Sequence, residues 1–432
     1  TERAEAIHRR FLAFDDRAVL TDNVFGYLWS KLAYAAMLFA TALTDDSIAD
    51  ALAHPTTRDV YADLAREVVA VARAAGIRLE AFDGFDPTAF DPGAGIDPAE
   101  RSLDGLVAHN RKAAARDGKF DAHQRDEGYR IELAFDEVTR IAQESGVHLH
   151  VSHLQAFGRI NWPKMDVILE KADAFLAGGG RVTWDRYPYL AGCTVLTAVL
   201  PQWTFSEGTK VLAQNLLKPD FRDRIREDFQ KGLDVWNNRS ISVGWSNMVV
   251  SAVNSDKNRW MEGRTVADLA KTCDKDPLDF VFDLLAEENL AVTMISHYGS
   301  EEVLDKVLGH PQATVGSDGI YGGRPHPRLY SAYPRYLAEF VRVRKIFDLP
   351  EAIRKVTSFP AAILGLKDRG TLREGAWADI VLLDPERVAD TATYDAPEQY
   401  PEGIPYVFVN GELVVDRGAF TGRLPGRALR KL

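Results

Sequence analysis

The sequence of 432 residues contains only two cysteines, Cys193 and Cys273. So few cysteines exclude a disulfide-bonded scaffold and a cysteine-rich zinc module, and they suit a reducing compartment. The sequence also lacks an apolar run of the about 18–20 residues that a membrane-spanning helix needs. The segment that comes nearest to this length is Leu32–Leu43. We therefore expect a cytoplasmic protein that makes no use of a membrane.

The sequence also has fewer basic than acidic residues. The sequence has 52 Lys and Arg residues against 63 Asp and Glu residues, which gives a net charge of −11, and it contains no basic run. Because nucleic acids and anionic membrane surfaces attract basic patches, we expect neither of them as a partner. Hydrophobic residues make up 46% of the chain, so a sizeable core is expected and disorder is not.

Residues 1–118 carry a helical pattern. Apolar side chains recur three and four positions apart in Phe25–Phe39 and again in Val60–Arg73. This spacing places them on one face of a helix. No apolar run in this part has the character of a strand, so the pattern predicts an all-α domain over residues 1–118.

After about residue 120 the pattern changes to short apolar runs that alternate with amphipathic stretches. Helix and strand are predicted in turn at residues 127–146 and 147–152, 164–176 and 181–184, 276–288 and 291–295, and 301–308 and 313–316. This alternation is typical of an α/β protein with a parallel sheet covered by helices. We assign residues 119–375 to this part.

The end of the chain, residues 376–432, has a different pattern of short β segments. Asn410-Gly411 stands between two of them. An Asn-Gly pair between apolar runs is the strongest short signal for a β-hairpin. The sequence therefore predicts a small β segment after the α/β part.

Three polar residues lie where an α/β enzyme places its active site. His123 precedes a predicted helix, His153 ends the predicted strand at 147–152, and Asp318 follows the predicted strand at 313–316. Side chains at the C-terminal ends of barrel strands line the usual active-site mouth. Two imidazoles can hold a zinc ion, and a nearby carboxylate can accept a proton from water that the metal activates. The alternative is that His123 caps a helix and His153 is a buried, hydrogen-bonded histidine, since no HExxH-type motif is present.

His148 and His150 form an HxH pair, a spacing that is common among metal ligands. Successive side chains along a strand point to opposite faces, so this pair lies opposite Leu149, Val151 and His153. The apolar face suits the interior of a barrel. We therefore expect the HxH pair beneath the covering helices, as hydrogen-bonded packing residues that bind no metal.

Further candidates stand on neighbouring segments. The segment Asp185–Tyr189 could hold a substrate or form a turn fixed by its proline. Arg328, on the loop after Asp318, could bind a carboxylate with two parallel hydrogen bonds, or it could belong to an exposed ion pair. Cys193 and Cys273 are expected to be small buried apolar residues.

The part of the chain after about residue 120 contains several longer segments in a fixed order. They are AHQRDEG, VSHLQAFGRINW, TWDRYPYLAGCTVL, VGSDG, HPRLYSAYPRYLAEFVR, EAIRKVTSFPAAILGLKDRGTLREGAWADIVLLDP and VNGELVVDRGAFTGRLPGRALR. Together they resemble the N-acyl-D-amino-acid deacylases (D-aminoacylases) of the amidohydrolase superfamily. The resemblance implies a (β/α)8 barrel beside a small β-sandwich, one or two zinc ions, and hydrolysis of the amide bond of small N-acyl-D-amino acids.

The resemblance also implies roles for individual residues. His123 and His153 match two metal-binding histidines of the family, and Asp318 matches its catalytic aspartate, which accepts a proton from the metal-activated water. Arg328 matches the arginine that binds the substrate carboxylate, and Tyr187 matches a substrate-binding tyrosine. Under this resemblance the chain is a hydrolase of carbon–nitrogen bonds other than peptide bonds.

The sequence departs from the family pattern at several places. Gln155 stands where the family usually has a lysine, and Cys193 stands where it usually has a serine. Both positions line the family's substrate pocket, and the loss of the lysine removes a cation that would pair with the substrate carboxylate. The family's HxH pair on its first strand and its metal-bridging cysteine have no counterpart here. We therefore expect a partial barrel that lacks its N-terminal strands.

Residues 1–118 resemble a different family, the ketopantoate reductases, in the helical C-terminal domain. The segments are LWSKLAYAAMLFATALTDDSIADAL, LAREVVAVARAAGI and SLDGLVAHNRKAA. No GxGxxG motif follows a strand, so the NADPH-binding domain of those enzymes is not expected. The chain thus resembles a fusion of parts of two enzymes, joined near residue 118.

Three functions follow from these resemblances. The main hypothesis is metal-dependent hydrolysis of N-acyl-D-amino acids, with Asp318 as general base. The second is a catalytically incomplete fusion or fragment, because the metal ligands are few. The third is an NADPH-dependent 2-dehydropantoate reductase. A partial barrel also leaves an open sheet edge, which the helical part, another chain in a homo-oligomer, or nothing would cover.

Overall fold

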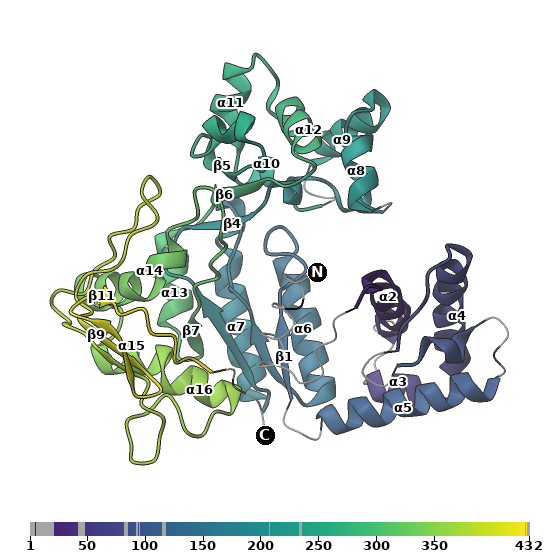
Figure 1. Cartoon of the computed structure of the whole chain (residues 1–432), viewed down its shortest axis with the longest axis horizontal. Helices are drawn as coiled ribbons and strands as arrows, with labels where there is room; N and C mark the ends of the chain where they lie inside the picture. Colours follow the sequence, from purple (N-terminus) through teal and green to yellow (C-terminus); the bar gives the residue numbers. More distant parts are fainter. Residues whose placement is uncertain are drawn as a thin grey trace. The chain divides into compact units, whose positions relative to one another are not determined.

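The computed structural model describes residues 5, 21–41, 48–81, 85–91, 94, 96–114, 118–206, 208–232, 236–427 and 429. The chain divides into two compact units (Figure 1). The first comprises Thr1–Phe120 with Arg140–His148 and Gly426–Leu432, and the second comprises Asp121–Thr139 with Leu149–Pro425. Across the described residues, no helix is both long enough and apolar enough to cross a membrane.

The first unit is built mainly from helices. They are α2 (Val24–Thr41), α3 (Ile48–Ala53), α4 (Arg58–Ala74), the short 3-10 helix η1 (Pro87–Phe90) and α5 (Ile96–Ala114). Helix α2 packs against α4, and α3 packs against α5. The predicted helices at 25–39 and 60–73 lie within α2 and α4. The identification of residues 1–118 as a separate reductase-like domain stays a prediction.

The core of these helices follows from the spacing of their apolar residues. On α4, Tyr61, Ala65, Val69 and Ala72 are buried, and they recur three or four positions apart along one face. Together with side chains of the other helices they form one buried cluster, which includes Met37, Leu52, Phe85, Phe90 and Leu103.

The second unit contains most of a parallel sheet with the strand order β1-β2-β3-β7. The strands are β1 (Lys119–Ala122), β2 (His148–Val151), β3 (Val182–Arg186) and β7 (Ala313–Val315). The connecting helices α6 (Ile131–Ser145), α7 (Lys164–Ala177) and α13 (Glu301–Gly309) lie near their predicted positions. Strand β2 pairs with β3, and β3 with β7, in parallel. The four parallel strands are consistent with a partial barrel.

The helix-covered face of the sheet is the apolar one. Trp184 of β3 donates from Nε1 to the Val307 carbonyl of α13 at 3.2 Å. In the strand register Trp184 lies between Val151 and Ala313, so these three apolar residues share the face that α13 covers. The expectation that the apolar face of this sheet forms the barrel interior is therefore wrong.

His150 accordingly lies on the face opposite α13. Its Nδ1 is 2.8 Å from Thr183 Oγ1, and its Nε2 is 3.2 Å from Asp185 Oδ2. The residue is hydrogen-bonded, as expected, but it is not packed beneath the helices. The physical reason is that the burial of hydrophobic side chains stabilises the fold most on the face of the sheet from which the helices exclude water.

A second sheet in this unit is antiparallel and has the order β4-β6-β5. Its strands are β4 (Ala191–Val195), β5 (Met248–Ala252) and β6 (Thr293–His297). The predicted strand at 291–295 corresponds to β6, which pairs antiparallel with both neighbours. Its expected place in the parallel sheet is therefore wrong. The apolar run predicts a buried strand but does not determine its partner.

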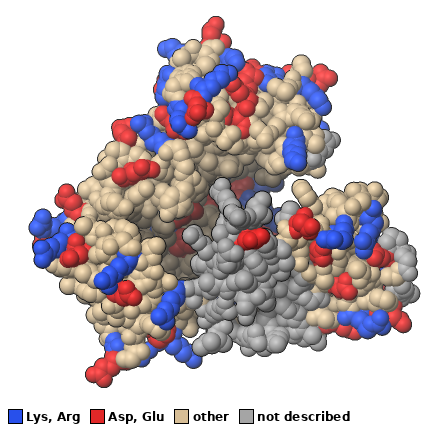
Figure 2. Space-filling model, viewed as in Figure 1, with Lys and Arg blue, Asp and Glu red and all other residues tan. Residues whose placement is uncertain are grey.

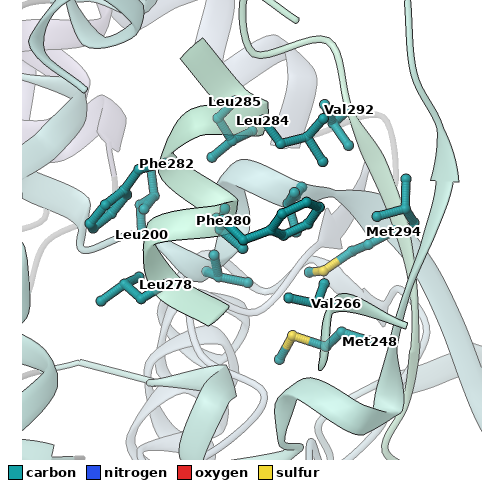
Figure 3. Close-up of a cluster of buried hydrophobic side chains, with 14 of the residues drawn as sticks. Leu200, Met248, Val266, Leu278, Phe280, Phe282, Leu284, Leu285, Val292 and Met294 are labelled. Atoms are coloured by element: carbon teal, nitrogen blue, oxygen red, sulfur yellow. The ribbon is translucent and has the colours of Figure 1, made fainter. Parts of the chain in front are cut away.

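A large hydrophobic core packs against this antiparallel sheet. Nearby helices of this part are α8 (Thr209–Asn215), α9 (Pro219–Gln230), α11 (Val266–Thr272) and α12 (Pro277–Glu287). Figure 3 shows Phe280 of α12, Met294 of β6 and Val266 of α11 pointing toward one another. Asp276 begins α12 as its N-cap and accepts a hydrogen bond from the Leu278 N–H at 2.8 Å, which satisfies a backbone group that the helix itself cannot.

The C-terminal part contains a third, antiparallel sheet of order β11-β10-β9-β8. Its strands are β8 (Ile380–Leu382), β9 (Tyr406–Val409), β10 (Glu412–Asp416) and β11 (Ala419–Phe420). Asn410 and Gly411 have φ angles of 50° and 83° and connect β9 with β10. The predicted hairpin is confirmed, because this turn requires two residues that tolerate positive φ.

The remaining helices of the second unit are short. They are η2 (Arg159–Asn161), η3 (Leu196–Val199), η4 (Gln202–Phe205), α10 (Arg239–Ser242), η6 (Trp245–Asn247), η7 (Asp256–Met261), α14 (Arg328–Arg335), the π-helix η8 (Tyr336–Val343), α15 (Leu349–Val356) and α16 (Ser358–Leu364). On the face shown in Figure 2, basic and acidic side chains are interspersed over the described surface.

Candidate active site

The structure brings His123 and His153 together at one edge of the parallel sheet. His123 follows β1 and His153 follows β2, and these two strands are neighbours. His153 Nε2 is 2.7 Å from His123 Nδ1, and the ring centroids are 4.5 Å apart. His153 has a φ angle of 39°, in the left-handed region that costs a non-glycine residue free energy. The backbone after β2 is therefore held in a conformation that turns this imidazole toward its partner.

Glu127 supports the histidine pair from the loop that precedes α6. Its Oε1 is 2.8 Å from Nδ1 of His153, and both side chains are 14% exposed. Burial alone would lower the pKa of His153, but the hydrogen bond and the negative charge of Glu127 raise it above its ordinary value. Burial alone would raise the pKa of Glu127, but His153 and the charge of Arg239 lower it. Sequence reasoning missed Glu127 because it was placed in the helix predicted to start at residue 127, whereas α6 starts at Ile131.

Asp318 and Arg328 form an ion pair after β7. Asp318 Oδ2 is 2.8 Å from Nη2 of Arg328. The Arg328 side chain is fully buried, whereas that of Asp318 is 37% exposed, so the alternative of an exposed ion pair is wrong for the arginine. The same Nη2 donates to the Cys193 carbonyl at 3.3 Å. Among the described residues, Nε and Nη1 of Arg328 have no hydrogen-bond partner.

Tyr187 and Gln155 meet in a buried polar cluster. The Gln155 side-chain oxygen accepts hydrogen bonds from the Tyr187 hydroxyl at 2.7 Å, from Arg186 Nη1 at 2.9 Å and from the Tyr298 hydroxyl. All four side chains are at most 5% exposed. The segment Asp185–Tyr189 therefore contributes to a buried network, and Tyr298, which sequence reasoning did not single out, comes from the loop after β6.

Both cysteines are free, and they differ in burial. Cys193 lies in β4 and is 7% exposed, and burial raises the pKa of its thiol. Its expected burial is confirmed. Cys273 is only partly buried, because it ends α11 at the margin of the hydrophobic core.

The histidine pair can supply two ligands to a metal ion. A tetrahedral zinc site with Zn–N bonds of about 2.0–2.1 Å separates two imidazole nitrogens by about 3.3 Å. The observed separation of 2.7 Å needs only a small opening of the pair. A carboxylate bonded to the second nitrogen of a ligating histidine, as Glu127 is, commonly orients such a ligand. Within the part of the chain that the structure describes, however, no group of three or more His, Cys, Asp or Glu side chains is arranged to hold a metal.

Comparisons with known proteins agree on one family. A family model described as the amidohydrolase family matches residues 41–415. The chain is 32% identical to an N-acyl-D-glutamate deacylase of Alcaligenes xylosoxydans xylosoxydans over 345 residues, which cover 79% of this chain and 59% of that protein. It is 30% identical to a D-aminoacylase of the same organism over 341 residues, which cover 78% and 60%. The chain thus spans about three fifths of the length of these curated relatives.

A solved structure gives a similar result. The N-acyl-D-glutamate deacylase from Bordetella bronchiseptica, complexed with zinc and a phosphonate inhibitor, has a TM-score of 0.59 and 26% sequence identity, and it covers 85% of this chain and 65% of that one. A D-aminoacylase studied for its binuclear metal center has a TM-score of 0.57 and 27% identity, with coverage of 84% and 64%. The family match begins within the segment predicted as a reductase-like domain, and these relatives do not favour the reductase alternative.

Proposed function

The chain belongs to the amidohydrolase family, and from this premise we propose that it hydrolyses the amide bond of N-acyl-D-amino acids in a metal-dependent reaction. The observation that carries the proposal is the approach of the His123 and His153 nitrogens to 2.7 Å at two neighbouring strand ends. The relatives named as N-acyl-D-glutamate deacylase and D-aminoacylase support the choice of substrate class.

The proposed roles combine the positions of the side chains with the resemblance to the deacylases. His123 and His153 would hold zinc, and Glu127 would fix the orientation of His153. When bound, zinc supplies Lewis-acid activation of water and of the amide carbonyl. Asp318 takes a proton from the attacking water and gives it to the leaving amine as the C–N bond breaks. Gly192 lies beside the Tyr187 hydroxyl. The Cys193 carbonyl accepts a hydrogen bond from Arg328.

Arg328 and Tyr187 would orient the substrate. Arg328 has unused donors at Nε and Nη1 among the described residues, and a guanidinium binds a carboxylate with two parallel hydrogen bonds. The α-carboxylate of the substrate would therefore approach Arg328, whose present carboxylate partner is Asp318. In this proposal the general base would lie beside the bound substrate, since Asp318 pairs with Arg328.

One set of measurements tests the proposal. The purified chain is analysed for bound zinc and assayed for release of amine from N-acetyl-D-amino acids and from their L forms. We expect bound zinc and D-selective release, and we expect Asp318→Asn to abolish turnover without changing the zinc content. Zinc below about 0.1 per chain together with no D-selective release would instead support the catalytically incomplete alternative, since catalytic zinc sites normally keep three protein ligands.

We also propose that residues 1–118 form a helical domain similar to the C-terminal domain of ketopantoate reductases. The buried cluster shared by α2, α3, α4 and α5 supports a domain with its own core. A fluorescence titration with NADPH should give no binding, because a helical domain of this kind lacks the glycine-rich turn that holds the dinucleotide. Saturable NADPH binding would revive the reductase alternative.

A further inference from the structure

Asp185 of β3 binds the turn after β2 through two hydrogen bonds. Its Oδ1 accepts from the His153 N–H at 3.2 Å, and its main-chain carbonyl accepts from the Leu154 N–H at 2.9 Å. His153 has a φ angle of 39° in this turn. A non-glycine residue keeps such a conformation only where its surroundings enforce it, and two bonds from the neighbouring strand are positioned to do so.

The other carboxylate oxygen of Asp185 contacts His150. Asp185 Oδ2 is 3.2 Å from His150 Nε2, and His150 Nδ1 is 2.8 Å from the Thr183 hydroxyl oxygen. An ionised carboxylate only accepts hydrogen bonds, so Nε2 carries a proton and donates to it. In the neutral ring Nδ1 then accepts from the Thr183 hydroxyl. The imidazole therefore orients the carboxylate that holds the turn.

Gly316 leaves the space that this carboxylate occupies. It follows β7, the strand that pairs with β3. A Cβ at position 316 would lie 2.7 Å from Asp185 Oδ1, which is too close for two atoms that are not bonded to each other. The oxygen that accepts the His153 N–H therefore fills the place of a side chain at position 316.

We propose that Asp185 and His150 are positioning residues for the metal ligand His153. Asp185 fixes the backbone conformation that turns the His153 imidazole toward His123. His150 in turn fixes the carboxylate of Asp185. The inference rests on the proposed function, in which His123 and His153 hold zinc. Glu127 contacts the imidazole of His153, whereas Asp185 contacts its main chain, so the two supports are distinct.

A purely structural role for Asp185 makes a different prediction. In that role the carboxylate only joins β2 to β3, and its loss lowers the free energy of unfolding without changing the backbone at His153. Asp185→Asn helps to separate the two roles, because an amide oxygen still accepts from the His153 N–H. The amide nitrogen can donate to His150 Nε2 if the imidazole takes its other tautomer, with Nδ1 donating to the Thr183 hydroxyl.

The first measurement is the crystal structure of the metal-free full chain for the wild type, Asp185→Ala and Asp185→Asn. In Asp185→Ala, His153 should leave the positive-φ region, and its Nε2 should move beyond hydrogen-bond distance of His123 Nδ1. In Asp185→Asn both features should stay as in the wild type. An unchanged φ at His153 in Asp185→Ala would overturn the inference, and this result needs no bound metal.

Zinc affinity, measured by competition with a chelator, is the second readout. Loss of a group that orients a metal ligand typically lowers metal affinity by about 10–100-fold. Asp185→Ala should therefore bind zinc at least about tenfold more weakly than Asp185→Asn, which has lost the same charge. His150→Leu keeps the carboxylate and removes one of its partners, so it should bind zinc about threefold more weakly than the wild type.

Gly316→Ala tests the same role without removing a charged group. Its new Cβ displaces the Asp185 carboxylate, and we expect zinc to bind at least about tenfold more weakly than to the wild type. This variant decides the question where Asp185→Ala does not fold. Wild-type zinc affinity in Gly316→Ala would overturn the role of Asp185, and wild-type affinity in His150→Leu would overturn that of His150.

Asp228→Ala is the matched control. Asp228 of α9 is also a buried aspartate that accepts two hydrogen bonds, from Trp203 Nε1 at 2.6 Å and from Lys231 Nζ at 2.8 Å. Its loss should lower the free energy of unfolding in urea denaturation and leave zinc affinity unchanged. A tenfold loss of zinc affinity in this control would contradict the inference. If the wild type binds no zinc, the proposed function fails, and the φ angle of His153 in Asp185→Ala still decides the positioning role.

Discussion

The ion pair between Asp318 and Arg328 joins the proposed general base to the proposed carboxylate-binding residue, and it can be tested by mutation. Asp318→Asn leaves the fully buried Arg328 guanidinium without its carboxylate partner. Removing one member of a buried pair typically costs about 3–5 kcal/mol. Because the Asp318 side chain is 37% exposed, water screens part of the interaction, and we expect a loss of about 2–3 kcal/mol in the free energy of unfolding.

Urea denaturation of the wild type, Asp318→Asn, Arg328→Met and the double variant measures this coupling. Arg328→Met should cost less than Asp318→Asn, since the partly exposed aspartate can be hydrated. The double variant should be no less stable than Asp318→Asn alone, so the coupling energy should be at least as large as the cost of Arg328→Met. If the two single losses add to within about 0.5 kcal/mol, the pair is not coupled and the reasoning is refuted.

The same pair makes a prediction about ligand binding. A substrate carboxylate that binds Nε and Nη1 of Arg328 competes with Asp318, which is bound to Nη2, for the single positive charge of the guanidinium. Asp318→Asn should therefore bind N-acetyl-D-amino acids at least as tightly as the wild type, while it loses turnover. Calorimetry and the amine-release assay on the same preparation measure both quantities. Binding weakened tenfold or more in Asp318→Asn would contradict the competition.

Three further predictions concern single residues of the second unit. The buried Glu288 carboxylate accepts hydrogen bonds from two backbone N–H groups and from the Asn258 amide; burial would raise its pKa, but these bonds lower it. Glu288→Gln should therefore lower the free energy of unfolding by about 2–3 kcal/mol at pH 7, as measured by urea denaturation. This loss should shrink as the pH falls below 4.5, the ordinary pKa of a glutamate, and through the lower pKa of Glu288 in the folded protein. Burial lowers the pKa of Lys355 from 10.5 to about 8, so the wild type should gain stability relative to Lys355→Met as the pH rises from about 8 to 10.5; a flat difference in melting temperature would contradict this. A Cβ at Gly192 would lie 2.6 Å from the Tyr187 hydroxyl, so Gly192→Ala should weaken calorimetric ligand binding about tenfold while the circular dichroism spectrum stays unchanged.

Local signals in the sequence were enough to predict many elements of the fold. The alternation of apolar runs and amphipathic stretches located β2, β3, β7 and their helices, and Asn410-Gly411 located the hairpin between β9 and β10. The pairing of β6 was not predictable in this way, because an apolar run carries no information about which strand will lie beside it. The face on which His150 lies was also missed. The alternation along a strand separates two faces, but it does not show which of them the helices will cover.

The residues of the candidate site also fall into a group that local sequence signals predict and a group that they do not. His123, His153 and Asp318 could be placed because each stands at the end of a predicted strand or before a predicted helix. Glu127 and Tyr298 could not, because their roles depend on the path of a loop and on contacts between distant parts of the chain. Tyr298 meets Gln155 across a separation of 143 residues, and no local pattern reports such a contact.

His153 and Asp318 have φ angles of 39° and 45°, and this shared feature bears on how the protein would respond to artificial selection. A glycine relieves the cost of such a conformation, which is about 1–2 kcal/mol for other residues. At position 318 this relief is smaller than the loss of about 2–3 kcal/mol expected when the buried Arg328 is left without its carboxylate partner. A library screened only for heat resistance should therefore retain aspartate at this position, even though turnover is not selected.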